Sequence, residues 1–368
     1  MLKHAPDTAP ASACHKRHRA ADRNWMGRPS PERRSRSTAG KSPVRASRTP
    51  GSVGEVPDAR GLSTRDIEAL FADVEGKSLL SRTAISEITE RLWAEYEAFV
   101  GRDLSEFEVL CLFVDGLAER LHLGQPREAV LAAWGILADG KKTLLHLAPG
   151  TKEDTESCRE FFRDMRRRGL SDPLLVVSDG APGIIRAIEE CFPRALRQRC
   201  LAHKMRNLAS KVPEDVWPEF KTRASACYQA ASPALARLLR DDITATYGRE
   251  LPSAVACLED DFAACVAHLR FPLGHRRAIR TTNLLERLFG EERRRTKVIP
   301  HAFGERAILK LMYAALIRAA ERWRGVCITE FEQRQLRAIR DEIDKDFTAR
   351  NALEVTVRQS HLSSNQRT

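Results

Sequence analysis

The order of short apolar runs in the middle of the chain constrains the fold more than any other feature of the sequence. Three such runs come first: VLCLFV (109–114), EAVLAAWGILA (128–138) and KTLLHLA (142–148). The dipeptide Asp139-Gly140 between the last two is a hairpin signal. A helical pattern (151–168) separates them from a fourth run, PLLVVS (173–178), and another helix follows at 183–191. The first three strands can pair through short turns but the fourth needs a helical crossover, so the sequence predicts an α/β fold with a mixed sheet flanked by helices.

Residues 1–60 differ from the rest of the chain in composition. They are rich in Arg, Ser, Pro, Ala and Gly, and they hold 13 Lys/Arg against 5 Asp/Glu, whereas the remainder holds 48 against 45. Most of the net charge of +11 therefore lies in this stretch. We predict a disordered basic tail, which could bind phosphates non-specifically, stay solvated, or reflect the choice of start site.

The hydrophobic pattern divides the chain into six parts. They are the basic tail (1–62), a helical segment (63–104), two parts of the sheet domain (105–203 and 276–348), an all-α insertion between these two parts (204–275), and a frayed tail (349–368). The insertion carries almost no strand signal and is punctuated by prolines.

Two helical patterns with a short pause between them lie at 64–99. Their spacing is compatible with a helix-turn-helix, in which Arg82, Thr83 and Ser86 would face DNA near the start of the second helix. A plain helical hairpin packed on the core explains the same pattern.

Two aspartates follow apolar runs and are candidates for metal binding. We expect Asp115 and Asp179 to end neighbouring strands, so that both carboxylates meet at one edge of the sheet. Such a pair can hold two divalent cations, and oxygen ligands favour Mg²⁺ or Mn²⁺. The alternative is that both are ordinary Asp-Gly turns, as Asp139-Gly140 is expected to be.

Glu286 is a third candidate, and it lies in a basic surrounding. The nearby cations are Arg280, Arg287, Arg293, Arg294, Arg295 and Lys297. This arrangement suits a metal site that also holds a DNA backbone, although a solvated helix face would look similar. Asn283 stands three residues before Glu286, so this carboxylate could instead close a capping box.

The segment RQRCLAHKMRN supplies further polar side chains. Cys200 and His203 have the spacing of half a zinc site, but no second pair stands at a suitable distance, so we expect no zinc. We expect Gln198, Cys200, His203 and Asn283 to support the active site, with His203 donating a hydrogen bond near the scissile phosphate.

Several blocks of the sequence resemble the mutator-type transposases of bacterial insertion sequences. These blocks are STRDIEALF, LLSRTAISEITERLW, RDLSEFEVLCLFVDG, LLVVSDGAPGIIRAIEECFP, RQRCLAHKMRN, RTTNLLERLFGEERRRTKVIPHAFGERA and RAAERWRG. The resemblance implies a ribonuclease-H-like fold with an all-helical insertion and an Asp-Asp-Glu triad, which falls on Asp115, Asp179 and Glu286. It further implies two metal ions, strand cleavage at the terminal repeats, transfer to target DNA, and a homodimer or higher oligomer on double-stranded DNA.

The sequence departs from this family before its first matching block, since residues 1–60 lack the expected N-terminal region that recognises the terminal repeats. A decayed or domesticated DNA-binding regulator is therefore an alternative, and a ribonuclease-H-like nuclease acting on RNA–DNA hybrids is another. No apolar stretch approaches the length of a membrane span, and nine cysteines without paired spacing predict no disulfide framework. We expect a cytoplasmic, nucleoid-associated protein with no membrane partner.

Overall fold

A computed structural model of the chain describes residues 82–119, 128–150, 154–286, 290, 305–321 and 323–365. The predicted basic tail and the first helix of the possible helix-turn-helix lie outside these residues. In the part that the structure describes, none of the helices combines the length and apolar character that a membrane span requires.

Helices and strands alternate much as the apolar runs predicted. In chain order they are α2 (Arg82–Gly101), β1 (Val109–Glu119), β2 (Glu128–Leu137), β3 (Lys142–Pro149), α3 (Thr155–Arg167), β4 (Leu175–Ser178), α4 (Pro182–Cys191), β5 (Leu196–Arg199), α5 (Leu201–Ala209), α6 (Trp217–Tyr228), α7 (Pro233–Tyr247), α8 (Pro252–Glu259), α9 (Phe262–Cys265), η1 (Ala267–Arg270), α10 (Leu273–Ile279), α12 (Glu305–Glu321) and α13 (Glu330–Asn365).

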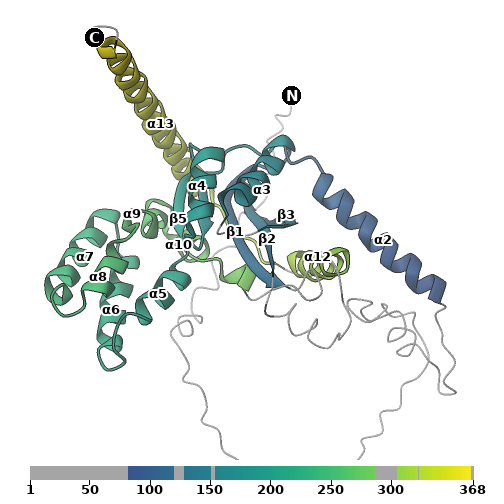
Figure 1. The fold of residues 1–368 in the computed structure, drawn as a ribbon, viewed down its shortest axis with the longest axis horizontal. Helices are drawn as coiled ribbons and strands as arrows, with labels where there is room; N and C mark the ends of the chain where they lie inside the picture. The colour runs from purple at the N-terminus through teal and green to yellow at the C-terminus, as the bar shows by residue number, and fades with distance from the viewer. Residues whose placement is uncertain are drawn as a thin grey trace, which may run out of the picture. The chain divides into compact units, whose positions relative to one another are not determined.

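The five strands form one mixed sheet in the order β3-β2-β1-β4-β5 (Figure 1). Strand β2 runs antiparallel to both β1 and β3, whereas β4 runs parallel to β1 and β5. The predicted mixed sheet is confirmed, and so is the hairpin between β2 and β3. At its turn Gly140 has a φ of +81°, and Lys141 N donates to Asp139 Oδ1 at 2.8 Å.

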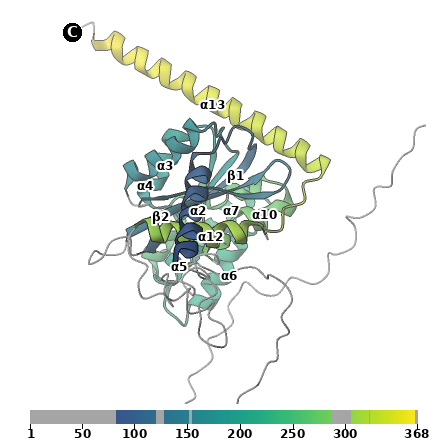
Figure 2. The same cartoon turned by 90° about the vertical axis from the view of Figure 1, so that its right-hand side faces the viewer.

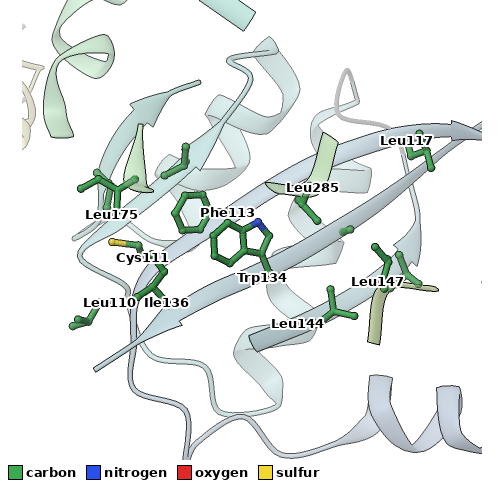
Figure 3. Close-up of a cluster of buried hydrophobic side chains, with 14 of the residues drawn as sticks. Leu110, Cys111, Phe113, Leu117, Trp134, Ile136, Leu144, Leu147, Leu175 and Leu285 are labelled. Atoms are coloured by element: carbon green, nitrogen blue, oxygen red, sulfur yellow. The ribbon is translucent and has the colours of Figure 1, made fainter. Parts of the chain in front are cut away.

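Side chains alternate between the two faces of the sheet, and each face has its own apolar core. One face packs against α2 and α12, which cross each other in Figure 2. There Phe113 of β1 stacks on Trp134 of β2, with ring centroids 3.9 Å apart (Figure 3). The other face carries Leu112 and Val114 and is covered by α3 and α4. Both faces are buried, so β1 reads as a continuous apolar run rather than an alternating one.

Strand β1 is longer than predicted. We expected it to end at Asp115, but it continues to Glu119 because β2 pairs with it over that whole length. Its parallel pairing with β4 is much shorter and stops at Phe113, opposite Val177. Asp115 therefore lies inside β1, at the point where its neighbour β4 has ended.

Helix α2 packs against the sheet domain through its C-terminal half. Tyr96 and Phe99 are buried there, and Tyr96 Oη donates to Leu147 O of β3 at 3.0 Å. This half of α2 is therefore packed on the sheet domain. The side chains of Arg82, Thr83 and Ser86, which we expected to face DNA, lie outside the described residues.

The predicted insertion is all helical and has a core of its own. Helices α5 to α8 and α9 lie beside β5 (Figure 1), and their buried side chains, such as Phe220 and Leu258, contact one another rather than the sheet. The main chain enters and leaves this segment at one place, because Leu201 N donates to Arg280 O at 2.9 Å.

Charged side chains anchor the helical segment to β5. Arg197 binds both carboxylate oxygens of Asp261, at 2.8 and 3.0 Å, and Arg199 forms an ion pair with Asp260. The fully buried Lys204 donates to Asp260 O at 2.5 Å. The two arginines join β5 to the far end of the insertion and so limit how the two can move against each other, while Lys204 ties α5 to the same place.

The C-terminal part of the chain is more helical than predicted. We expected residues 349–368 to be frayed, but α13 continues to Asn365. No glycine or proline interrupts residues 330–365, so no residue breaks the helix. Leu336, Ile339 and Ile343 near its start pack into the core on the α12 side of the sheet.

The segment before α13 packs against the turn between β2 and β3. Val326 N donates to Gly140 O at 2.8 Å, and a Cβ on Gly140 would lie 1.9 Å from Val326 O. Only glycine fits here, because the backbone is left-handed and the space is filled.

We expect Gly140→Ala to lower the free energy of unfolding by about 1–3 kcal/mol or more, from backbone strain and the collision with Val326. Gly101→Ala is the control: it lies at the end of α2 with no atom within 4 Å of its Cβ position, and it should be neutral or slightly stabilising. Urea unfolding of both variants checks this. Equal stabilities would contradict the packing described for Gly140.

Candidate metal centre

Asp115 is a buried carboxylate at the end of the parallel part of the sheet. Its side chain is on the same face as Phe113, and only 4% of the residue is exposed. Gly116 N donates to Asp115 Oδ1 at 2.9 Å, which holds one oxygen. Because β4 stops short of this level, the second oxygen faces the segment that follows α10.

Thr282 fills the place beside Asp115 and links it to β5. It is fully buried, and its hydroxyl Oγ1 lies 3.1 Å from Asp115 Oδ2 and 3.4 Å from Cys200 Sγ. Thr282 N donates to Cys200 Sγ at 3.3 Å, and Cys200 N donates to Ser178 O at 2.6 Å. A continuous set of contacts thus connects β1, the end of β4, the end of β5 and residue 282.

Three side chains converge in front of this buried frame. Asp115, His203 and Glu286 each offer one ligand atom, and these atoms all lie within 4.8 Å of one another. His203 Nε2 is 3.5 Å from Glu286 Oε1. The side chains of His203 and Glu286 are 22% and 25% exposed, so the group opens to solvent on one side.

Helix α5 presents the residues that meet Glu286. Cys200 precedes the helix, and His203 and Arg206 follow at steps of three, which brings them to one helix face. Arg206 Nη2 donates to Glu286 Oε1 at 2.8 Å and to Oε2 at 2.7 Å. Arg206 was not among the predicted site residues. Its spacing of three residues from His203 was the sign in the sequence that the two share a helix face.

The capping-box alternative for Glu286 does not match its surroundings. Glu286 N donates to Thr282 O at 3.3 Å and the helical residues start at Asn283, so Thr282 and not Asn283 caps this turn. The carboxylate of Glu286 is held by Arg206 and His203. Asn283 Oδ1 is buried and has no hydrogen-bond donor among the described residues.

Asp179 lies in the turn after β4, two residues beyond Val177 just as Asp115 lies two residues beyond Phe113. It is not a member of the three-residue group. Its Oδ1 accepts a hydrogen bond from Ala181 N at 3.1 Å. The next residue, Gly180, has a φ of +88°, and a Cβ there would lie 2.4 Å from Arg199 Nε. Arg199 thus covers the turn that carries Asp179.

Electrostatics couple the polar groups of the centre. Burial opposes ionisation of Cys200, but the hydrogen bond and charge of His203, together with Thr282, bring the pKa of this thiol below its ordinary value. Burial likewise opposes protonation of His203, yet interaction with Cys200 and the charges of Asp115 and Glu286 raise its pKa above the ordinary value. The site therefore favours a positive charge next to its carboxylates.

Gln198 has a different position from the one we expected. Its Nε2 donates to Cys265 O at 3.0 Å, and its Oε1 accepts from His268 N at 2.8 Å. Both partners belong to residues 201–280, so Gln198 binds the helical segment. Its contacts join β5 to α9 and η1.

Most of the predicted DNA-contacting cations lie outside the described residues: Arg287, Arg293, Arg294, Arg295 and Lys297. Arg280 is described, and its carbonyl oxygen accepts the bond from Leu201 N at the root of the helical segment.

The donor set of this centre suits a hard divalent cation. Asp115 and Glu286 supply carboxylate oxygens and His203 an imidazole nitrogen, within the span that a metal ion can bridge. Cys200 is turned towards Thr282, and the described residues hold no four-ligand Cys/His set of the kind that structural zinc requires.

Known proteins similar to this chain are transposases. The family described as "Transposase, Mutator family" matches residues 58–325. The transposase for insertion sequence element IS6120 of Mycolicibacterium smegmatis is 33% identical over 267 residues, which are 72% of this chain and 83% of that protein. The transposase for element IST2 of Acidithiobacillus ferrooxidans is 35% identical over 206 residues, 56% and 70% of the two chains. The transposase for element IS1081 of Mycobacterium tuberculosis is 31% identical over 271 residues, 72% and 64%.

We expect Thr282→Val to weaken Mn²⁺ binding about tenfold, because the hydroxyl that orients Asp115 is lost while the shape of the side chain is kept. Asp115→Asn should weaken binding further, since it removes a ligand charge. Calorimetric titration of the purified protein measures both. Thr222→Val, which removes an exposed hydroxyl on α6, is the matched control and should bind as the unaltered chain does. An unchanged affinity in Thr282→Val would contradict the role given to Thr282.

Proposed function

Because the chain belongs to the Mutator family of transposases, we propose that it is the transposase of a bacterial insertion sequence, which cuts DNA at the ends of the element and joins them to a target. The observation that carries this proposal is the convergence of Asp115, His203 and Glu286 at the point where the parallel part of the sheet ends.

We infer that the sheet domain is ribonuclease-H-like. The support is its strand order, with an antiparallel three-stranded half followed by two parallel strands, and the helical segment inserted between β5 and the turn that carries Glu286. In this arrangement residues from distant parts of the chain share one end of the sheet, as phosphoryl-transfer chemistry with two carboxylate-bound cations requires.

The proposed catalytic residues are Asp115, Asp179 and Glu286. Asp115 and Glu286 would hold divalent cations together with His203, and Asp179 would complete the carboxylate set from the neighbouring strand end. Two Mg²⁺ or Mn²⁺ ions bound there would supply an activated water and charge stabilisation for the leaving oxygen.

The protein's own residues would hold this arrangement in place. Thr282 orients Asp115 through Oδ2, and Gly116 N holds Oδ1, so this carboxylate is fixed before DNA arrives. Gly180 and Arg199 set the turn that carries Asp179. His203 would bind a cation through a neutral imidazole, so the cation would replace the proton that Cys200, Asp115 and Glu286 favour on it in the free protein.

The proposed reaction has two transfers at phosphorus. A water oxygen attacks the phosphodiester at the element end, the bond to the 3′ oxygen breaks, and a 3′-hydroxyl is released. That hydroxyl then attacks a phosphodiester of the target DNA, forming a new bond while one target strand is broken. The number of phosphodiester bonds is conserved in the second step, and no covalent bond to the protein forms.

The partners of this activity are double-stranded DNA and, we propose, a second copy of the chain. Terminal repeats and target DNA both carry phosphate backbones, which suits a site with Arg206 beside Glu286 and several arginines in the sequence that follows. Two element ends must be cut together, which favours a dimer or a larger assembly on DNA.

The test is strand cleavage and joining on labelled duplexes taken from both flanks of the gene, with Mg²⁺ or Mn²⁺. We expect Asp179→Asn to reduce cleavage by at least about a hundredfold, the scale of losing one group that stabilises transition-state charge. Asp139→Asn is the matched control, because Asp139 is also followed by glycine but lies in the exposed hairpin turn, which Asn-Gly preserves.

Equal cleavage by these two variants would contradict the assignment of Asp179. An unaltered chain that binds the duplexes but never cuts them would contradict the proposed activity and leave a DNA-binding role. Cleavage of RNA–DNA hybrids without strand joining would instead indicate a ribonuclease-H-like nuclease.

A further inference from the structure

Both oxygens of Glu286 are occupied by a side chain that competes with any cation. Arg206 Nη2 lies 2.8 Å from Oε1 and 2.7 Å from Oε2. A metal ion at Glu286 would bring a second positive charge close to this guanidinium. Because the Glu286 side chain is only 25% exposed, water screens that repulsion incompletely.

Arg206 has hydrogen-bonding capacity that the ion pair does not use. A guanidinium carries five N–H donors, and only Nη2 contacts Glu286. The side chain is 57% exposed, so a ligand can reach it from solvent. The fork of an arginine matches a phosphate as well as it matches a carboxylate.

The main chain of Arg206 is fixed in α5, one helical turn after the ligand His203. It can therefore exchange partners by rotation of its own side chain, without movement of α5. A DNA strand whose phosphate enters the centre would bring a negative charge to the exposed side of Arg206, just where the cations displace it from Glu286.

We propose that Arg206 pairs with Glu286 in the free protein and moves to a backbone phosphate when DNA and divalent cations bind, so that cation loading and DNA binding favour each other. This inference rests on the proposed function. It makes Arg206 a positioning residue and explains why an exposed arginine is paired with a carboxylate of the metal centre.

The first measurement is Mn²⁺ binding to the full chain without DNA, by calorimetric titration. Arg206→Gln should bind Mn²⁺ about threefold to tenfold more tightly than the unaltered chain, because its competitor is gone. Arg206→Lys, which keeps the charge without the fork, should fall between the two. Arg237→Gln on α7 removes another exposed arginine, outside the group of Asp115, His203 and Glu286, and should change nothing. Thermal unfolding checks that all variants are folded.

The second measurement is the salt dependence of duplex binding with Ca²⁺, which allows binding without cleavage. Arg206→Gln should bind DNA more weakly, and its slope of log affinity against log salt should be shallower by about 1, as expected for one lost phosphate contact. DNA should also raise the Mn²⁺ affinity of the unaltered chain more than that of Arg206→Gln, since coupling between two ligands is reciprocal.

Two failures can be told apart. If the unaltered chain binds neither Mn²⁺ nor DNA, the proposed function is wrong and the coupling with it. If the unaltered chain binds both, but Arg206→Gln has the same Mn²⁺ affinity or the same salt slope, the exchange of partners is wrong while the proposed function stands.

Discussion

The buried contact of Thr282 with Asp115 and Cys200 holds the candidate centre together. It joins β1, the end of β5 and the turn that carries Glu286, which are far apart in the sequence. Strand β1 continues past the end of its pairing with β4, and Thr282 fills the space that this leaves beside Asp115. A buried carboxylate needs hydrogen-bond donors, so losing the Thr282 hydroxyl beside Asp115 would lower the stability of the folded protein.

The surroundings of this contact explain why carboxylates can share one end of the sheet. Like charges at close range repel, and each must be balanced. Asp115 is balanced by donors from the main chain and Thr282, and Glu286 by Arg206 and His203. Asp115 is thus balanced by fixed hydrogen-bond donors, whereas Glu286 is balanced by two positively charged or protonatable side chains.

Much of the fold could be predicted because short-range patterns encode it. The apolar runs identified the strands, and Asp139-Gly140 identified the hairpin. The errors have a common cause, which is that pairing with distant residues decided the outcome. Strand β1 passes Asp115 because β2 pairs with it beyond that residue, and Gln198 binds main-chain groups of Cys265 and His268, far along the sequence. The contacts of His203 and Arg206 with Glu286 depend on how an entire inserted segment folds back, which no local pattern specifies.

The hydrogen bond from Leu201 N to Arg280 O makes the helical segment a closed excursion of the main chain. Helices α6 and α7 can be lengthened or shortened while Cys200 and Thr282 stay side by side, because His203 and Arg206 lie on α5, at the start of the excursion. Evolution can therefore alter the outer helices of such a chain, and with them whatever those helices touch, without rebuilding the chemistry. The bond at its root, together with the ion pairs of Arg197 and Arg199, separates the part that is free to diversify from the part that is not.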